Sequence, residues 1–298
     1  MISDLLLALL KLNLAASAAI VLVLALRPAI LKLFGAQATY ALWLAPPLAG
    51  AACLLPALRS VPETAQGTPN IAAMIEGAPI VSLVLTVVWL AGAAVVLTGL
   101  IAGQRRFMRR AAAGEAGPAI IGILDPRLIL PRDFTERYTE DEQVLIRAHE
   151  RVHVERDDPR ANALLAALQC LFWYNPLVHL AANRIRLDQE LSCDAAVIAR
   201  HPGARRRYAQ AMLKTQLGGL SAPVGCHWLA PQRHPLEARI ALLKTPTPTS
   251  RRQILGFGLI TAIALATALT AWTAQPPRTR QPPAPGFPAP VMNIILMR

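Results

Sequence analysis

Residues 148–153 read AHERVH and contain the pattern H-E-x-x-H. An α-helix has 3.6 residues per turn, so His149 and His153 lie on one helix face and can bind the same metal ion. Glu150 lies beside them and can take a proton from a water molecule that the metal activates. The alternative is an ordinary amphipathic helix with two histidines, because a pattern of three fixed positions also arises by chance. The pattern alone therefore does not establish a zinc site, and the neighbouring sequence has to provide further evidence for one.

The residues before the motif supply a helix start. Thr139-Glu140-Asp141-Glu142 matches the capping box Thr-x-x-Glu, in which the first and last side chains cap the helix reciprocally. This helix is expected to continue through His153 to about Asp157. Asp158 is then expected to cap the next helix, with Pro159 at its first helical position. A metal motif on a helix with its own start signal favours a zinc site.

A zinc site of this type needs a third protein ligand, often a glutamate from a later helix. Residues 177–199 predict such a helix, and it carries Glu190 and Asp194 four positions apart. Glu190 is the best candidate for the third ligand, and the alternative is a solvated charge near Arg186. Asp194 would lie one turn further on, where it can accept a hydrogen bond from a ligand histidine and orient it.

The composition indicates a membrane protein. The chain has 298 residues, of which 54% are hydrophobic, and its mean hydropathy is +0.40. Its net charge of +12 does not indicate nucleic-acid binding, because the basic residues flank apolar runs, as they do at cytoplasmic membrane boundaries. The 4 cysteines form no Cys-x-x-Cys pair, so neither a disulfide framework nor a thiolate zinc site is indicated.

Four apolar runs are long enough to cross a bilayer. They cover about residues 5–26, 33–58, 78–101 and 254–274. A signal peptide is the alternative for the first run, but its acidic start favours a retained helix. Pro46-Pro47 should kink or break the second run. The arginines after the third run place its end in the cytoplasm by the positive-inside rule: Arg105, Arg106, Arg109 and Arg110.

Residues 161–182 are also apolar, but Asn175-Pro176 should split them into two short helices. We expect a buried hairpin or a re-entrant segment here, because a single crossing would place Glu190 on the wrong side of the bilayer from His149. Two short strands are expected upstream, at residues 119–124 and 128–130.

The predicted fold is an α-helical membrane protein with four transmembrane helices. Three of them lie within residues 1–102, and residues 254–274 form the fourth. Residues 103–253 are expected to be a cytoplasmic, mainly helical zinc metallopeptidase domain with a small β element. Residues 275–298 form a proline-rich tail, which we expect to lie outside the cell together with the N-terminus.

Several segments resemble the BlaR/MecR-type membrane antirepressor metallopeptidases. They are HERVHVERDD from residue 149, LFWYNPLVH from residue 171 and QELSCDAAV from residue 189, together with GILDPRLILP upstream and HPLEARIALL downstream. The resemblance covers roughly residues 119–244. It implies a gluzincin that binds one zinc ion per chain through His149, His153 and Glu190, with Glu150 as the catalytic base.

The resemblance also implies a role in signalling. Proteins of this family cut a cytoplasmic winged-helix repressor or a similar regulator, often cut themselves, and lie in the bacterial inner membrane. Arg156, Asp158 and Asn162 match the family's extended motif and would support the site, and Asp194 would orient a ligand. The β-lactam receptors carry a penicillin-binding sensor domain after the last span, and we expect none in residues 275–298.

The expected partners are the lipid bilayer and a cytoplasmic repressor as substrate, without direct nucleic-acid binding and with a homodimer left open. The substrate is expected to add as a strand along residues 120–124 or 128–130. Two other functions remain in view: a membrane quality-control zinc protease, and a scaffold with a structural or inactive zinc site. The intact Glu150 argues against the scaffold, because a structural site needs no general base.

Overall fold

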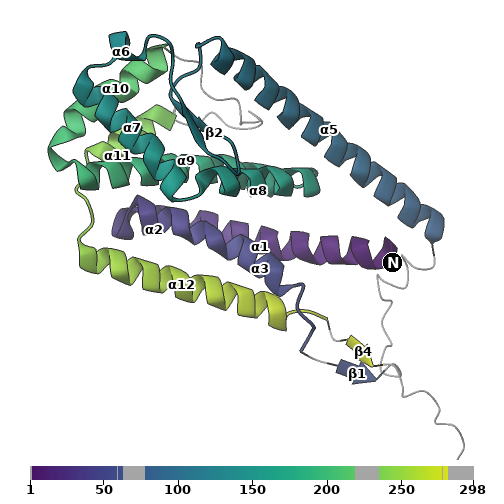
Figure 1. Cartoon of the computed structure of the whole chain (residues 1–298). Helices are drawn as coiled ribbons and strands as arrows, with labels where there is room; N and C mark the ends of the chain where they lie inside the picture. The colour runs from purple at the N-terminus through teal and green to yellow at the C-terminus, as the bar shows by residue number, and fades with distance from the viewer. Residues whose placement is uncertain (1, 59, 63–77, 219–234, 277, 281–298) are drawn as a thin grey trace, which may run out of the picture.

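The computed structural model describes residues 2–58, 60–62, 78–218, 235–276 and 278–280, and this part of the chain is mainly helical, as the sequence predicted (Figure 1). The elements in chain order are α1 (Ile2–Phe34), α2 (Ala36–Ala41), the 3₁₀ helix η1 (Leu42–Leu44), α3 (Ala45–Ala52), β1 (Ser60–Pro62), α5 (Pro79–Ala112), β2 (Ala119–Ile121), β3 (Arg127–Ile129), α6 (Phe134–Arg137), α7 (Glu140–Glu155), α8 (Asp158–Leu171), α9 (Pro176–Arg200), η3 (Pro202–Ala204), α10 (Arg205–Gly218), α11 (Pro235–Leu243), α12 (Ser250–Thr273) and β4 (Arg278–Arg280).

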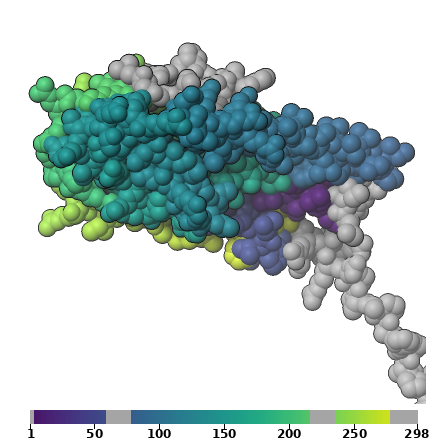
Figure 2. All heavy atoms as spheres, turned by 45° about the horizontal axis from the view of Figure 1, so that its top comes forward, coloured from purple at the N-terminus to yellow at the C-terminus, as the bar shows by residue number. Residues whose placement is uncertain are grey.

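Three of the described helices are long and apolar enough to cross a membrane: Asp4–Phe34 within α1, α5 and α12. They contain the first, third and fourth predicted runs. α5 continues beyond its apolar part through the arginine cluster to Ala112. Its apolar side chains are largely exposed, as expected for contact with lipid, and the helix forms a ridge that projects beyond the rest of the described chain (Figure 2).

The second predicted run is not a single helix. α1 continues to Phe34, and Gly35 interrupts it with a φ of 86°. A side chain at Gly35 would be strained, and its Cβ would lie 2.6 Å from Cγ of Pro248. The run then continues as α2, η1 and α3, with Pro46 and Pro47 in the first turn of α3. Because proline lacks an N–H, the backbone changes to a short 3₁₀ turn before it re-enters an α-helix.

α12 runs antiparallel to α1 and alongside α3. The start of α12 lies at the end of α1, where a Cβ added to Gly256 would lie 2.8 Å from Cβ of Phe34. The end of α12 lies beside α3, where the Cys53 Sγ is 3.8 Å from the carbonyl oxygen of Ala271. β1 follows α3 and β4 follows α12, and these strands pair in parallel (Figure 1). The chain therefore leaves α3 and α12 on the same side of the molecule.

The apolar residues 161–182 form a helical hairpin of α8 and α9, split at Asn175-Pro176 as predicted. Its turn lies against the middle of α1, because Nδ2 of Asn175 donates to Oδ1 of Asn13 at 2.6 Å. The turn also contacts α5, where the Trp89 indole donates to the carbonyl of Leu171 at 2.8 Å. These contacts hold the hairpin beside two membrane-length helices.

α9 connects two apolar cores. Its first half, with Val178 and Ala181, packs into a core formed with α1, α2, η1 and α12. Its second half, with Val197 and Ile198, packs into a core formed with α7, α10 and α11. Glu190, the predicted third ligand, lies on α9 between these cores, and the other predicted metal residues lie on α7. β2 and β3 are the two predicted strands, with β2 ending at Ile121 rather than at residue 124, and the structure pairs them antiparallel. Most of the predicted tail, 275–298, lies outside the described residues.

Candidate metal centre

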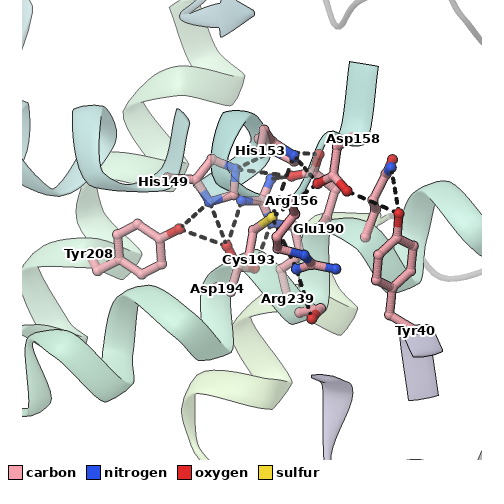
Figure 3. Close-up of polar contacts among 12 residues, drawn as sticks. Tyr40, His149, His153, Arg156, Asp158, Glu190, Cys193, Asp194, Tyr208 and Arg239 are labelled. Atoms are coloured by element: carbon pink, nitrogen blue, oxygen red, sulfur yellow. Dashed lines mark hydrogen bonds and ion pairs between the residues drawn. The ribbon is translucent and has the colours of Figure 1, made fainter. Parts of the chain in front are cut away.

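α7 and α9 pack together and turn the predicted metal-binding side chains toward one another (Figure 3). α7 begins with the predicted capping box: the Thr139 N–H donates to Glu142 at 2.9 Å, and the Glu142 N–H donates to the Thr139 hydroxyl at 3.4 Å. This start sets the helix that carries His149, Glu150 and His153. His149 and Glu150 are buried, at 7% and 8% exposure.

The three predicted ligands converge on one point. Nε2 of His149 lies 3.2 Å from Nε2 of His153 and 3.3 Å from Oε2 of Glu190. Nε2 of His153 lies 3.6 Å from Oε1 of Glu190. A tetrahedral zinc ion with bonds of about 2.0–2.1 Å separates its ligand atoms by about 3.3 Å. The donor atoms and their spacing therefore fit a zinc ion.

Each histidine is held from behind through its other ring nitrogen. Nδ1 of His153 lies 2.7 Å from Oδ2 of Asp158. Nδ1 of His149 lies 2.8 Å from the Tyr208 hydroxyl and 3.3 Å from Oδ1 of Asp194. When Nδ1–H donates to such a group, the lone pair of Nε2 faces the metal position.

Asp158 reaches His153 through a sharp corner between α7 and α8. Asp157 has a φ of 57°, in the left-handed region that a residue other than glycine seldom adopts. The prediction that Asp158 caps α8 was wrong by one residue. α8 begins at Asp158, and Asp157 is the residue before the helix. The carboxylate of Asp158 is thus free of the capping role and binds His153.

Arg239 of α11 joins the acidic residues of the site. Its Nη1 lies 2.8 Å from Oε2 of Glu190, and its Nε and Nη2 donate to the two oxygens of Asp194 at 2.8 and 2.7 Å. Burial raises the pKa values of Glu190 and Asp194, but Arg239 and the hydrogen bonds with His149 outweigh burial and lower both below their ordinary values. Both groups are therefore carboxylates at neutral pH.

Glu150 differs from the other carboxylates of the site. Burial raises its pKa above the ordinary value, although the neighbouring His149 and His153 lower it. Among the described residues, no hydrogen bond or ion pair holds its carboxylate. A buried carboxylate with free oxygens beside the three convergent ligands is suited to accept a proton.

The remaining predicted residues, Arg156 and Asn162, do not contact the three ligands. Arg156 donates to the Ser192 hydroxyl at 2.8 Å, and its guanidinium lies 4.3 Å from the centre of the Tyr40 ring. The Asn162 Oδ1 is buried and has no hydrogen-bond partner within the described part of the chain. Arg156 therefore binds α9 at the edge of the site. Within the described part of the chain, no hydrogen bond connects the Asn162 side-chain oxygen to the site.

Four residues of the site were not predicted from the sequence: Tyr40, Cys193, Tyr208 and Arg239. Arg239 lies in the segment HPLEARIALL and Cys193 in QELSCDAAV, both part of the resemblance. Tyr208 and Tyr40 have no fixed spacing from the H-E-x-x-H pattern. The Cys193 thiol is buried 3.4 Å from Nδ1 of His153, and burial raises its pKa well above the ordinary range. It therefore remains a neutral thiol.

Comparisons with known proteins agree with this geometry. The BlaR1 peptidase M56 family model matches residues 109–243, which include all three convergent ligands. The region belongs to the BlaR/MecR-type peptidase family. The regulatory protein BlaR1 of Bacillus licheniformis is 35% identical over 81 residues, which are 27% of this chain and 13% of the relative. The methicillin resistance mecR1 proteins of Staphylococcus aureus and Staphylococcus epidermidis are each 28% identical over 103 residues, 34% of this chain and 17% of the relative.

The chain thus spans less than a fifth of the length of these BlaR/MecR relatives. No solved structure matches it. The family match and the three membrane-length helices identify a bacterial membrane protein with a metallopeptidase region. Tyr40 lies outside the residues that the family model covers.

Proposed function

We propose that this protein is a zinc metalloendopeptidase of the bacterial inner membrane that relays a signal by cutting a cytoplasmic winged-helix repressor. The observation that carries the proposal is the convergence of His149, His153 and Glu190, with separations of 3.2–3.6 Å between their donor atoms. The carboxylates behind both histidines support a site built to hold a metal.

In this proposal, one zinc ion per chain binds to the three convergent side chains. When bound, zinc supplies a Lewis acid for the scissile carbonyl and for the attacking water. Glu150 accepts the proton of that water at its carboxylate as the C–O bond forms. It then delivers the proton to the nitrogen of the leaving amine as the C–N bond breaks. Asp158 and Asp194 hold the two imidazoles in the orientation that points each Nε2 toward the metal position. Arg239 holds the Glu190 carboxylate.

The membrane arrangement forms part of the proposal. We propose four crossings, with α2, η1 and α3 returning along α1 as the second. This segment, residues 36–52, is about 25 Å long at 1.5 Å per residue, close to the thickness of the hydrocarbon core. The pairing of β1 with β4 supports a location of the ends of α3 and α12 on the same side of the membrane. The arginines at the end of α5 support a cytoplasmic location for residues 103–253.

The substrate is proposed to add as a strand to the β2–β3 pair. This sheet has only two strands within the described chain, so each strand has an unpaired edge. Side chains of the connecting loop and β3 are exposed, with Leu124 at 85% and Leu128 at 40%. An extended segment of a repressor, or of this chain during self-cleavage, would gain main-chain hydrogen bonds there.

The first test compares the wild-type chain with Glu150→Gln in proteoliposomes. Bound zinc is measured by mass spectrometry, and cleavage is followed for the chain itself and for a co-purified candidate repressor. We expect Glu150→Gln to keep its zinc and to lose cleavage by at least about a hundredfold. Glu155→Gln, an exposed change on the same helix, is the matched control and should retain both. Zinc loss from the wild-type protein, or unchanged cleavage by Glu150→Gln, contradicts the proposal.

A further inference from the structure

Tyr40, on α2, contacts Asp158, the residue that supports the candidate ligand His153. Its hydroxyl donates to Oδ1 of Asp158 at 2.9 Å, while Oδ2 of the same carboxylate lies 2.7 Å from Nδ1 of His153 (Figure 3). Asp158 is 1% exposed. Both oxygens of the buried carboxylate are therefore held, one by a candidate metal ligand and one by Tyr40.

The direction of the Tyr40 hydrogen bond follows from its second partner. Nε2 of Gln189 lies 3.0 Å from the Tyr40 hydroxyl and can only donate to it. The hydroxyl has one hydrogen, so that hydrogen is directed at Asp158. The Arg156 guanidinium lies 4.3 Å from the centre of the ring and fixes its plane. Tyr40 is thus held by its ring and by both hydrogen-bonding functions of its hydroxyl.

The elements on either side of α2 are themselves fixed to α9 by separate contacts. Asp188 is fully buried, accepts from the Trp43 indole at 2.8 Å and pairs with Arg27 of α1 at 2.6 Å. These contacts anchor α1 and η1 to α9 without touching Asp158. Tyr40 therefore projects from an anchored segment toward the metal centre.

We propose that Tyr40 is a positioning residue of the metal centre: its hydroxyl holds Asp158, and through Asp158 the His153 imidazole, in the geometry that binds the metal. The inference rests on the proposed zinc site. A carboxylate held at one oxygen only can turn about its Cβ–Cγ bond, and the imidazole that it orients then loses its fixed position. Supporting contacts of metal ligands typically change metal affinity by about 10–100-fold. The membrane segment that carries Tyr40 thereby sets the zinc affinity of the site.

The test uses the full-length chain in nanodiscs and measures its zinc dissociation constant by competition with a chelator. We expect Tyr40→Phe to weaken zinc binding about tenfold and to leave the melting temperature of the zinc-free protein within a few degrees. Tyr138→Phe is the matched control, because it removes another buried tyrosine hydroxyl, bonded to Thr215 at 3.0 Å, away from the ligands. Its zinc affinity should equal that of the wild type.

Two further variants test the route of the effect. In an Asp158→Ala background, Tyr40→Phe should weaken zinc binding no further, because the carboxylate that it holds is absent. Gln189→Leu leaves the bond to Asp158 in place and should give a smaller loss in the same direction, which keeps the test available if Tyr40→Phe does not fold. Equal zinc affinity of wild type and Tyr40→Phe overturns the inference alone. A wild-type chain that binds no zinc overturns the proposed function instead.

Discussion

Arg239 and Glu190 form an ion pair within the candidate metal centre, with Nη1 of the arginine 2.8 Å from Oε2 of the glutamate. The same guanidinium donates to both oxygens of Asp194. One side chain from α11 thus pairs with two carboxylates of α9, of which Asp194 is fully buried and Glu190 is partly exposed. Without it, two like charges would face each other in a poorly solvated site.

Replacing Arg239 should therefore destabilise the fold as well as the site. For Arg239→Met we expect the free energy of unfolding of the zinc-free protein to fall by about 3–5 kcal/mol, because the fully buried Asp194 carboxylate loses its counter-charge. Chemical unfolding in neutral detergent micelles measures the change. Arg200→Met is the control, because its pair with Glu155 is exposed and is expected to contribute less than about 1 kcal/mol. Similar effects of the two substitutions would refute the role of Arg239.

Asp194 should affect zinc binding more than catalysis at saturating zinc. Asp194→Asn keeps the size of the side chain but removes the charge that faces Nδ1 of His149 at 3.3 Å. We expect a zinc dissociation constant about 10–100-fold higher, measured by chelator competition. Asp141→Asn, at an exposed position of α7, should leave it unchanged. Unaltered zinc affinity in Asp194→Asn would show that Tyr208 alone orients the imidazole.

Glu142 links the start of α7 to α10 and should make stability depend on pH. Burial raises the pKa of Glu142, but the Lys214 ammonium at 2.6 Å and the Thr139 backbone N–H outweigh burial and bring the pKa below its ordinary value of 4.5. A carboxyl group with a lowered pKa adds stability that is fully present above its unfolded-state pKa and is lost as the pH falls through its folded-state pKa.

The expected result is a pH-dependent difference between the wild type and Glu142→Gln. At neutral pH the wild type should be more stable by about 1–2 kcal/mol, and the two unfolding curves should converge once the pH falls below the folded-state pKa of Glu142. Thermal unfolding across a pH series measures this. A stability difference that stays constant down to the lowest pH would show that the charge of Glu142 is not the cause.

The packing of the α8–α9 hairpin against α5 can be tested at two glycines of the same helix. A Cβ added to Gly92 would lie 2.0 Å from the Trp173 ring, whereas one added to Gly99 would meet nothing within 4 Å. We expect Gly92→Leu to destabilise the protein by about 1–3 kcal/mol through overpacking and Gly99→Leu to be neutral. Melting temperatures in nanodiscs measure both. Equal melting temperatures would mean that the hairpin does not rest on α5.

The sequence predicted best what depends on neighbouring residues. The capping box at Thr139, the helix face shared by His149 and His153, and the break at Asn175-Pro176 all follow from local geometry. The contact of Tyr40 with Asp158 joins positions that are 118 apart in the chain and have no pattern in common. Such a contact depends on how α2 packs against the α8–α9 hairpin, and hydropathy carries no information about that packing.

The differences between prediction and structure have local physical causes. By hydropathy, residues 33–58 form one apolar run. Hydropathy carries no information about backbone angles, so it could not predict the positive φ of Gly35 that ends α1. The boundary before α8 was placed one residue late, because aspartate at position 158 is a good capping residue. In the folded protein its carboxylate binds His153 instead, and Asp157 adopts the left-handed conformation at the corner.

The α8–α9 hairpin also separates the two parts of the candidate ligand set along the chain, because His149 and His153 precede its turn and Glu190 follows it. In the chain order, α8 and α9 follow α1 and α5 and precede α12. The contacts that hold the hairpin turn come from Asn13 and Trp89, in helices synthesised earlier. Glu190 is synthesised only after this hairpin turn. The three convergent ligands are therefore all present only after α1, α5 and the hairpin turn that separates His153 from Glu190 have been synthesised.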